Sequence, residues 1–199
     1  PKMPYNGTAL SRDEITTLKN WINDGAHNAC GDPMFSDDCS NSKLFISNQG
    51  CDQVVTLDPA TRLIQKWFNV GVTPVTESPH MMKVSPDRQY LYVALYSGLI
   101  QRYRTCDESF VDEIDVTAGT GISGGQWGTI AIGPDGKKGY SVDYSNNRIA
   151  TINLENFPMT AYTSYSLASI DFYFPHGITT NQAGDKLYIT DQVGGNVFI

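Results

Sequence analysis

Hydrophobic and polar residues along this chain form a pattern that returns at a fixed step. Three short apolar runs centred on Tyr92, Tyr140 and Tyr188 superpose, and the step from each tyrosine to the next is the same. A similar run at residues 43–46 precedes the first by nearly this step. Polar turns flank each run, as in strands joined by hairpins. A repeat of roughly 40–50 residues made of short strands is typical of β-propellers, whose blades stack because none can bury its apolar face alone.

The segment in front of each tyrosine run repeats as well. A polar turn comes directly before the run, and a further short apolar run comes before the turn. We expect these further runs to be the strands nearest the propeller axis; they are residues 82–84, 130–132 and 178–180. The glycine-rich residues 119–125 are expected to form a loop between blades. The pattern therefore predicts a mainly β fold, a partial β-propeller of about three and a third four-stranded blades over residues 43–199.

A different periodicity occupies the start of the chain. Ser11 and Glu14 match a capping box, and apolar residues at positions 15, 18, 21 and 22 form one stripe of a helix. Gly25 is placed to end that helix in a left-handed cap. We therefore predict one short α-helix, about residues 12–24, within a first segment of residues 1–29. A polar, turn-rich linker is expected over residues 30–42.

The net charge argues against nucleic acid as a partner, and the hydropathy argues against a transmembrane segment. The 199 residues carry a formal net charge of −7, whereas nucleic-acid binding needs clustered Lys and Arg. No run of 18 apolar residues occurs, so no transmembrane segment is predicted in this chain. Because the repeat pattern looks unfinished at both ends, we expect a fragment of a longer protein, whose remaining blades are needed to close the ring.

Four cysteines lie in loops near the start of the repeats: Cys30, Cys39, Cys51 and Cys106. An even number in such positions favours structural disulfides and an oxidising compartment. Four cysteines allow three pairings, of which Cys30 with Cys39 is the easiest to close. Free thiols are one alternative, and a zinc site is another, although no C-x-x-C pair occurs.

Two histidines are candidate metal ligands. His80 and His176 each follow a proline and hold the same place ahead of a repeat tyrosine, while the middle blade has Gly128 at this position. Loops ahead of an innermost strand line the rim of a propeller channel, where two neutral imidazoles can bind a metal. Their separation of two blades suggests that they lie too far apart to share one ion. In the alternative interpretation each histidine fixes its loop by a hydrogen bond to the backbone of a neighbouring blade.

Two stretches of the repeats are similar to a known family. Residues 54–58 (VVTLD) and 84–93 (VSPDRQYLYV) resemble the YVTN family of β-propeller repeats. The resemblance covers residues 43–199. It implies a seven-bladed propeller of bacteria or archaea that is periplasmic, extracellular or at the cell surface.

Residues 1–29 resemble the C-terminal end of a class I cytochrome c domain. The residues that carry this are the P-K-M-P segment at the start and the helix that follows it. The resemblance implies that Met3 is an axial haem ligand, in the Met/His pattern that raises the potential. No C-x-x-C-H attachment motif occurs in the 199 residues. Haem c is therefore expected in the parent protein and not in this chain alone.

Together these patterns favour electron transfer in the parent protein, with the propeller as a docking or substrate-binding platform. The partner would be a redox protein or a small-molecule substrate. One alternative is a non-enzymatic surface propeller that binds a protein or a glycan. Another is a redox metalloenzyme with a metal at the hub histidines. No G-x-S-x-G elbow or activated nucleophile is present, so we expect the isolated chain not to be catalytic, and the parent to be an oxidoreductase component.

Overall fold

The structure of this chain is a computed structural model. It describes residues 7–24, 26, 39, 42–72, 76–121, 125–166 and 172–199. The chain divides into two compact units, Pro1–Asp38 and Cys39–Ile199. Met3, Gly25 and Cys30 lie outside the described residues, so the haem ligand, the helix cap and the Cys30 thiol stay predictions.

The first unit contains helix α1 (Arg12–Asn23). Its capping box is present as predicted, because the Ser11 hydroxyl accepts from the Glu14 amide at 3.2 Å. The Glu14 carboxylate in turn accepts from the Ser11 amide at 2.7 Å. The predicted helix is therefore confirmed, with its apolar stripe exposed at Ile15, Leu18, Trp21 and Ile22.

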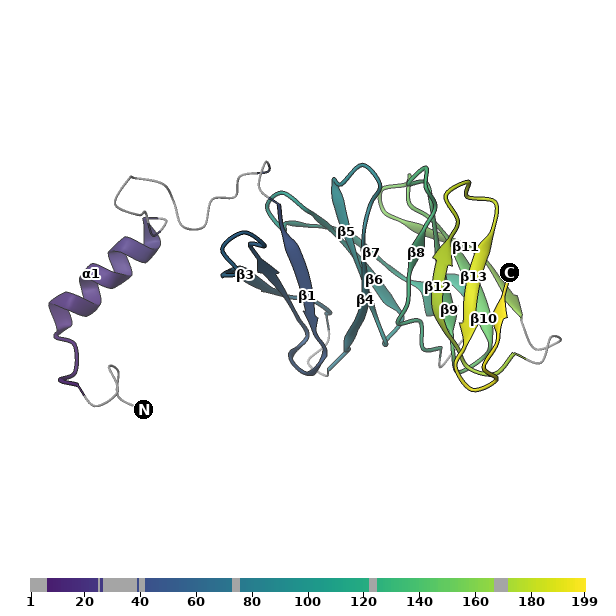
Figure 1. The fold of residues 1–199 in the computed structure, drawn as a ribbon, viewed down its shortest axis with the longest axis horizontal. Helices are drawn as coiled ribbons and strands as arrows, with labels where there is room; N and C mark the ends of the chain where they lie inside the picture. Colours follow the sequence, from purple (N-terminus) through teal and green to yellow (C-terminus); the bar gives the residue numbers. More distant parts are fainter. Residues whose placement is uncertain are drawn as a thin grey trace. The chain divides into compact units, whose positions relative to one another are not determined.

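The second unit is a succession of antiparallel sheets that follow one another in chain order (Figure 1). The first sheet consists of β1 (Leu44–Asn48), β2 (Gln53–Leu57) and β3 (Ile64–Asn69), with a 3-10 turn η1 (Gln49–Cys51) after β1. The second sheet consists of β4 (Pro79–Val84), β5 (Tyr90–Leu95), β6 (Leu99–Arg104) and β7 (Phe110–Asp115).

The third and fourth sheets continue the pattern. The third consists of β8 (Ala131–Ile132), β9 (Lys138–Asp143), β10 (Arg148–Asn153) and β11 (Thr160–Ser166). The fourth consists of β12 (Pro175–Thr180), β13 (Leu187–Asp191) and β14 (Val197–Phe198). The mainly β, propeller-like fold is thus confirmed, with two four-stranded and two three-stranded sheets in the described part of the chain. The sheets are open and do not close into a ring.

A short second helix, α2 (Val116–Thr120), lies between β7 and β8. The sequence indicated only a glycine-rich loop here, and that interpretation was wrong for the first part of the segment. The helix forms because the Asp115 carboxylate caps it by accepting from the Ala118 amide at 3.0 Å. Gly121 ends it with a left-handed backbone, φ 69°.

The sequence repeat is visible in the backbone. Arg88, Gly136 and Gly184 occupy equivalent places in the turns before β5, β9 and β13, and all three have positive φ, at 62°, 72° and 75°. Each donates its amide to the carbonyl three residues earlier, at 2.9, 2.9 and 3.1 Å. The turns that the sequence aligned therefore share one geometry, including a strained left-handed arginine where the other repeats have glycine.

Alternate residues of one strand supply two apolar cores. Leu91, Val93 and Leu95 of β5 pack with Val54 of the first sheet. Tyr92 and Ala94, on the opposite face of the same strand, pack into a cluster that the third sheet completes with Ala150, Ile152 and Leu154. A third cluster lies between the third and fourth sheets. Because strand side chains alternate between faces, each sheet joins its two neighbours, which is the packing of stacked blades.

A buried ion pair also links the second and third sheets. The Arg102 side chain is 1 % exposed and binds both oxygens of Asp112. Its remaining donors reach the carbonyls of Leu154 at 2.8 Å and Asn156 at 2.9 Å. Its guanidinium lies 3.9 Å from the centre of the Phe157 ring. One side chain of β6 thereby holds the end of β10 and the turn that follows it.

The cysteines pair differently from the expectation. Cys39 is bonded to Cys106, 67 residues away, and not to Cys30. The local pairing looked easiest because the sequence gives only chain distance, whereas the fold brings the turn after β6 next to Cys39. Cys51 is a free, exposed thiol. In the described residues no helix is long and apolar enough to cross a membrane.

Candidate functional site

The two candidate histidines occupy equivalent and unusual backbone positions. His80 follows Pro79 at the start of β4, and His176 follows Pro175 at the start of β12. The residues before the prolines, Ser78 and Phe174, have φ of 56° and 68°. A left-handed backbone costs a non-glycine residue about 1–3 kcal/mol. Such a conformation persists only where the surroundings hold it, and at functional sites the strain serves to place side chains.

Both histidines also lie at irregularities in strand pairing. The register of β4 against β5 shifts between Pro79 and Met81, and that of β12 against β13 shifts between Pro175 and Ile178. A β-bulge turns a side chain away from the regular alternation of a strand. The two bulges therefore re-aim the two imidazoles at the same end of their sheets.

The carboxylates of Asp52 and Asp191 hold these loops in place by accepting hydrogen bonds from loop amides. Asp52 accepts the amides of Glu77 at 2.9 Å and Ser78 at 2.7 Å. In the fourth sheet, Asp191 accepts the amide of Tyr173 at 3.2 Å. Because buried backbone donors need acceptors, these bonds stabilise the strained approach to each proline.

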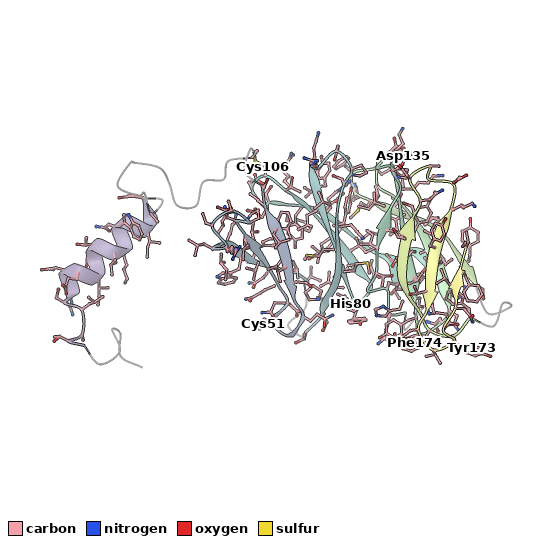
Figure 2. The ribbon with its side chains drawn as sticks, viewed as in Figure 1. Cys51, His80, Cys106, Asp135, Tyr173 and Phe174 are labelled. Carbon is pink, nitrogen blue, oxygen red and sulfur yellow. A yellow bond between two sulfur atoms is a disulfide. The ribbon has the colours of Figure 1, made fainter. Side chains whose placement is uncertain are left out.

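The histidine side chains meet. His80 Nε2 and His176 Nε2 lie 3.1 Å apart, with ring centres 5.0 Å apart and planes nearly perpendicular at 83°. The expectation that they lie too far apart was wrong, because the two imidazoles are in contact. Figure 2 shows His80 at the same edge of the sheets as Tyr173 and Phe174, whereas Cys106 and Asp135 lie at the opposite edge.

Glycine in the middle blade makes this meeting possible. A Cβ on Gly128 would lie 3.0 Å from the Tyr96 ring and 3.2 Å from His80 Cβ. Gly128 holds the position that histidine holds in the second and fourth sheets, one repeat after His80 and one before His176. The absence of a side chain there leaves the space that His80 and Tyr96 fill.

Two further side chains contact His80. Tyr96 Oη lies 3.2 Å from Nε2, and Gln49 Nε2 lies 2.6 Å from Nδ1. The hydrogen-bond partners found for His80 in the described residues are thus side chains, so for His80 the structure shows no bond to the backbone of a neighbouring blade; for His176 this alternative stays a prediction. We name Gln49, His80, Tyr96 and His176 the rim site.

Aromatic rings extend the rim site across three sheets. The Tyr96 ring lies 4.4 Å from that of His80 and 5.7 Å from that of Tyr144. The Tyr144 ring lies 4.7 Å from that of Phe174. These contacts fix the orientation of His80 and Tyr96 from both sides.

The electrostatics favour the uncharged form of His80 near neutral pH. Burial lowers the pKa of His80 below 6.5, and the neighbouring His176 lowers it further. Burial also raises the pKa values of Tyr96 and Tyr144. At neutral pH His80 is therefore a neutral imidazole. Because the amide nitrogen of Gln49 can only donate, Nδ1 accepts in this arrangement and Nε2 carries the ring proton. A metal ion at Nε2 would require this proton to move to Nδ1, with the Gln49 amide turned so that its oxygen accepts it.

The distance between the two nitrogens matches neighbouring positions of one metal ion. With metal–nitrogen bonds of about 2.0–2.1 Å, ligands at a right angle lie about 2.9 Å apart and tetrahedral ligands about 3.4 Å apart. The observed 3.1 Å lies between these values. In the described residues no group of three or more His, Cys, Asp or Glu side chains could hold a metal. An ion held by this pair would therefore keep open positions, as catalytic metals do.

A separate cavity lies elsewhere in the second unit. It has a volume of about 790 Å³ and is lined by residues around the disulfide and the turn before β5, among them Cys106, Arg88 and Arg104. The neighbouring Lys43 is already paired with Glu108 at 2.6 Å. Cys106 marks the edge opposite the histidines in Figure 2, so the cavity and the rim site are separate.

Tyr96, Gln49 and the role of Gly128 were not identified from the sequence. A signal for Tyr96 exists, because Tyr96 and Tyr144 are one full repeat apart and thus at the same place in consecutive blades. Gln49 has no such signal, since its contact with His80 depends on how the first sheet packs beside the second.

Comparisons with known proteins identify the fold. No family model matches the chain, and no curated protein matches it. Hydrazine synthase from Kuenenia stuttgartiensis is similar in structure, with a TM-score of 0.61, 23% identity and coverage of 81% of this chain and 46% of that chain. Dihydro-haem d1 dehydrogenase NirN, in complex with DHE, has a TM-score of 0.58, 16% identity and coverage of 82% and 33%.

A third similar structure has no redox function in its name. The β-propeller domain of Myceliophteria thermophila Cps50 (Swd1) has a TM-score of 0.61, 11% identity and coverage of 86% of this chain and 50% of that chain. This chain therefore spans a third to a half of the length of these structures. At such low identities the similarity shows the fold alone, and that fold is the β-propeller.

Proposed function

We propose that this chain is the propeller part of an extracytoplasmic redox protein, and that His80 and His176 bind a transition-metal ion at the rim site. The observation that carries the proposal is the 3.1 Å separation of their Nε2 atoms. Two blades contribute one nitrogen each, and the bulges and left-handed residues before the prolines hold both side chains in place. A merely structural histidine would not need this arrangement twice.

The donor atoms limit the metal to a class. Neutral imidazole suits copper, zinc, iron and nickel, whereas calcium and magnesium require oxygen ligands. The rim site offers two nitrogens and no carboxylate among its four residues. A first-row transition metal with open positions for a substrate or for solvent is therefore the group that fits.

Electron transfer through haem c in the parent protein is a second candidate function. It is supported by the resemblance of residues 1–29 to a cytochrome c segment and by a similar structure whose name includes haem d1. Met3 lies outside the described residues, so its contacts offer no test of haem binding. In this proposal the propeller is the docking or substrate platform for a redox partner protein or a small molecule.

The compartment is part of the proposal. The bond between Cys39 and Cys106 supports a periplasmic, extracellular or cell-surface location, because such bonds persist in oxidising environments. The YVTN resemblance supports a bacterial or archaeal propeller in the same compartments.

The metal proposal is tested by titrating the chain with Cu²⁺ and with Zn²⁺ in a calorimeter. Wild-type protein is expected to bind one equivalent, and His80→Ala and His176→Ala to bind at least 10–100-fold more weakly, since even outer-shell changes cost about that much. His27→Ala is the matched control, because His27 is the only other histidine in the sequence. Equal binding by all four proteins would refute the proposal. A urea midpoint for each variant shows that the loss is not unfolding.

The haem proposal needs the full-length protein from its native envelope. A pyridine haemochrome spectrum with covalent haem, together with a sulfur-to-iron absorption band that Met3→Ala removes, would support it. If neither haem nor metal is found, a surface propeller that binds a protein or a glycan is the function that stands.

A further inference from the structure

A third donor atom faces the histidine pair. Tyr96 Oη lies 3.2 Å from His80 Nε2, the same nitrogen that lies 3.1 Å from His176 Nε2. Both neighbours of this nitrogen can donate a lone pair. The site that the proposed function assigns to two histidines therefore has a phenolic oxygen next to the Nε2 atom of His80.

Tyr96 is held in this position by its own blade. Its amide donates to the carbonyl of Ser78 at 3.2 Å, so the turn after β5 is tied to the loop that carries His80. Its ring lies against that of His80 at 31° between planes, and Gly128, which has no side chain, lies close to both residues. A ligand that is oriented before the metal arrives loses little freedom on binding.

The neighbouring repeat offers a comparison within the same chain. Tyr144 holds the equivalent position in the third sheet, one repeat later. Its ring contacts are with Tyr96 and Phe174, and no contact with a histidine occurs in the described residues. The contact with His80 is thus made by the hydroxyl of Tyr96 and is not a general property of the repeat.

We infer that Tyr96 is the third protein ligand of the rim site and that its phenolate makes the site selective for an oxidised ion, Cu(II) or Fe(III). This inference rests on the proposed function. When the oxygen–metal bond forms, the O–H bond breaks and the proton leaves to water. The bound phenolate would lower the net charge of the metal site by one. A hard anionic oxygen favours Cu(II) or Fe(III) over Cu(I), which prefers soft sulfur donors.

The probe is Cu(II) added to the full chain, followed by visible absorption, electron paramagnetic resonance and calorimetry. Wild-type protein is expected to show a phenolate-to-copper charge-transfer band together with hyperfine coupling to two imidazole nitrogens. Tyr96→Phe removes one oxygen and keeps the ring, so it should lose the band, retain the nitrogen coupling and bind about tenfold or more weakly. Tyr144→Phe should keep both the band and the affinity.

The outcomes separate the two proposals. Copper bound through both histidines, with the same spectrum and affinity in Tyr96→Phe as in wild type, overturns the role of Tyr96 and leaves the proposed function standing. Copper binding that His80→Ala and His176→Ala do not weaken overturns the proposed function. If Tyr144→Phe loses the band and Tyr96→Phe keeps it, Tyr144 is the ligand instead of Tyr96. That result also overturns the inference.

Discussion

The buried Arg102 is expected to be a main link between the second and third sheets. Arg102→Met keeps most of the volume and the apolar stem but removes the guanidinium. The change leaves the Asp112 carboxylate, whose side chain is 11 % exposed, without its cation. It also leaves the carbonyls of Leu154 and Asn156 without the donors that now reach them at 2.8 and 2.9 Å.

The size of the effect follows from these contacts. Removing one partner of a buried ion pair costs about 3–5 kcal/mol, because the remaining charge stays buried. Loss of the contact with the Phe157 ring adds about 0.5–2 kcal/mol. With a urea slope of about 2 kcal/mol/M, the midpoint of unfolding should fall by about 2 M. Arg102→Lys retains the charge but cannot form the forked contact, so its loss should be intermediate.

Urea unfolding followed by tryptophan fluorescence suits this test, because Trp127 is fully buried in the cluster that joins the same two sheets. The double variant Arg102→Met/Asp112→Leu removes the stranded charge and should recover a large part of the loss. Lys137→Met breaks an exposed pair with Glu155 and should leave the midpoint unchanged. A loss below about 1 kcal/mol for Arg102→Met, or no recovery in the double variant, would refute the reasoning.

Three further outcomes are expected. Cys106→Ser opens a loop of 67 residues and should lower the free energy of unfolding by about 4 kcal/mol in urea, with Cys51→Ser as a neutral control; equal midpoints would contradict this. Gly128→Ala places a Cβ 3.0 Å from the Tyr96 ring and should cost about 1–3 kcal/mol and weaken copper binding; unchanged binding would show that the rings can move. His80, which faces His176 and Tyr96, has a lowered pKa in the folded chain. As the pH falls, the unfolded chain therefore binds a proton at this residue before the folded chain does. Stability should therefore fall as the pH drops below 6.5, and less so in His80→Gln, in urea midpoints from pH 7.5 to about 5.5. A decline that is the same in both proteins would assign it to other groups.

The sequence by itself determined the architecture of the second unit. The constant step between repeats predicts where strands and turns recur. These features are local, because the backbone of a strand or a turn depends on residues close in the chain. The helix after Ser11 was predictable for the same reason.

Only the tertiary structure decided which residues meet. His80 and His176 lie two repeats apart in the chain, and their contact depends on two bulges, two left-handed residues and a glycine in the blade between them. The pairing of Cys39 with Cys106 depends likewise on the packing of sheets. A repeat pattern specifies each blade but not how far side chains reach across the rim, because that distance is set by the packing between blades. The sequence therefore identified the two histidines as candidates, and the fold decided that they meet and that Tyr96 and Gln49 lie beside them.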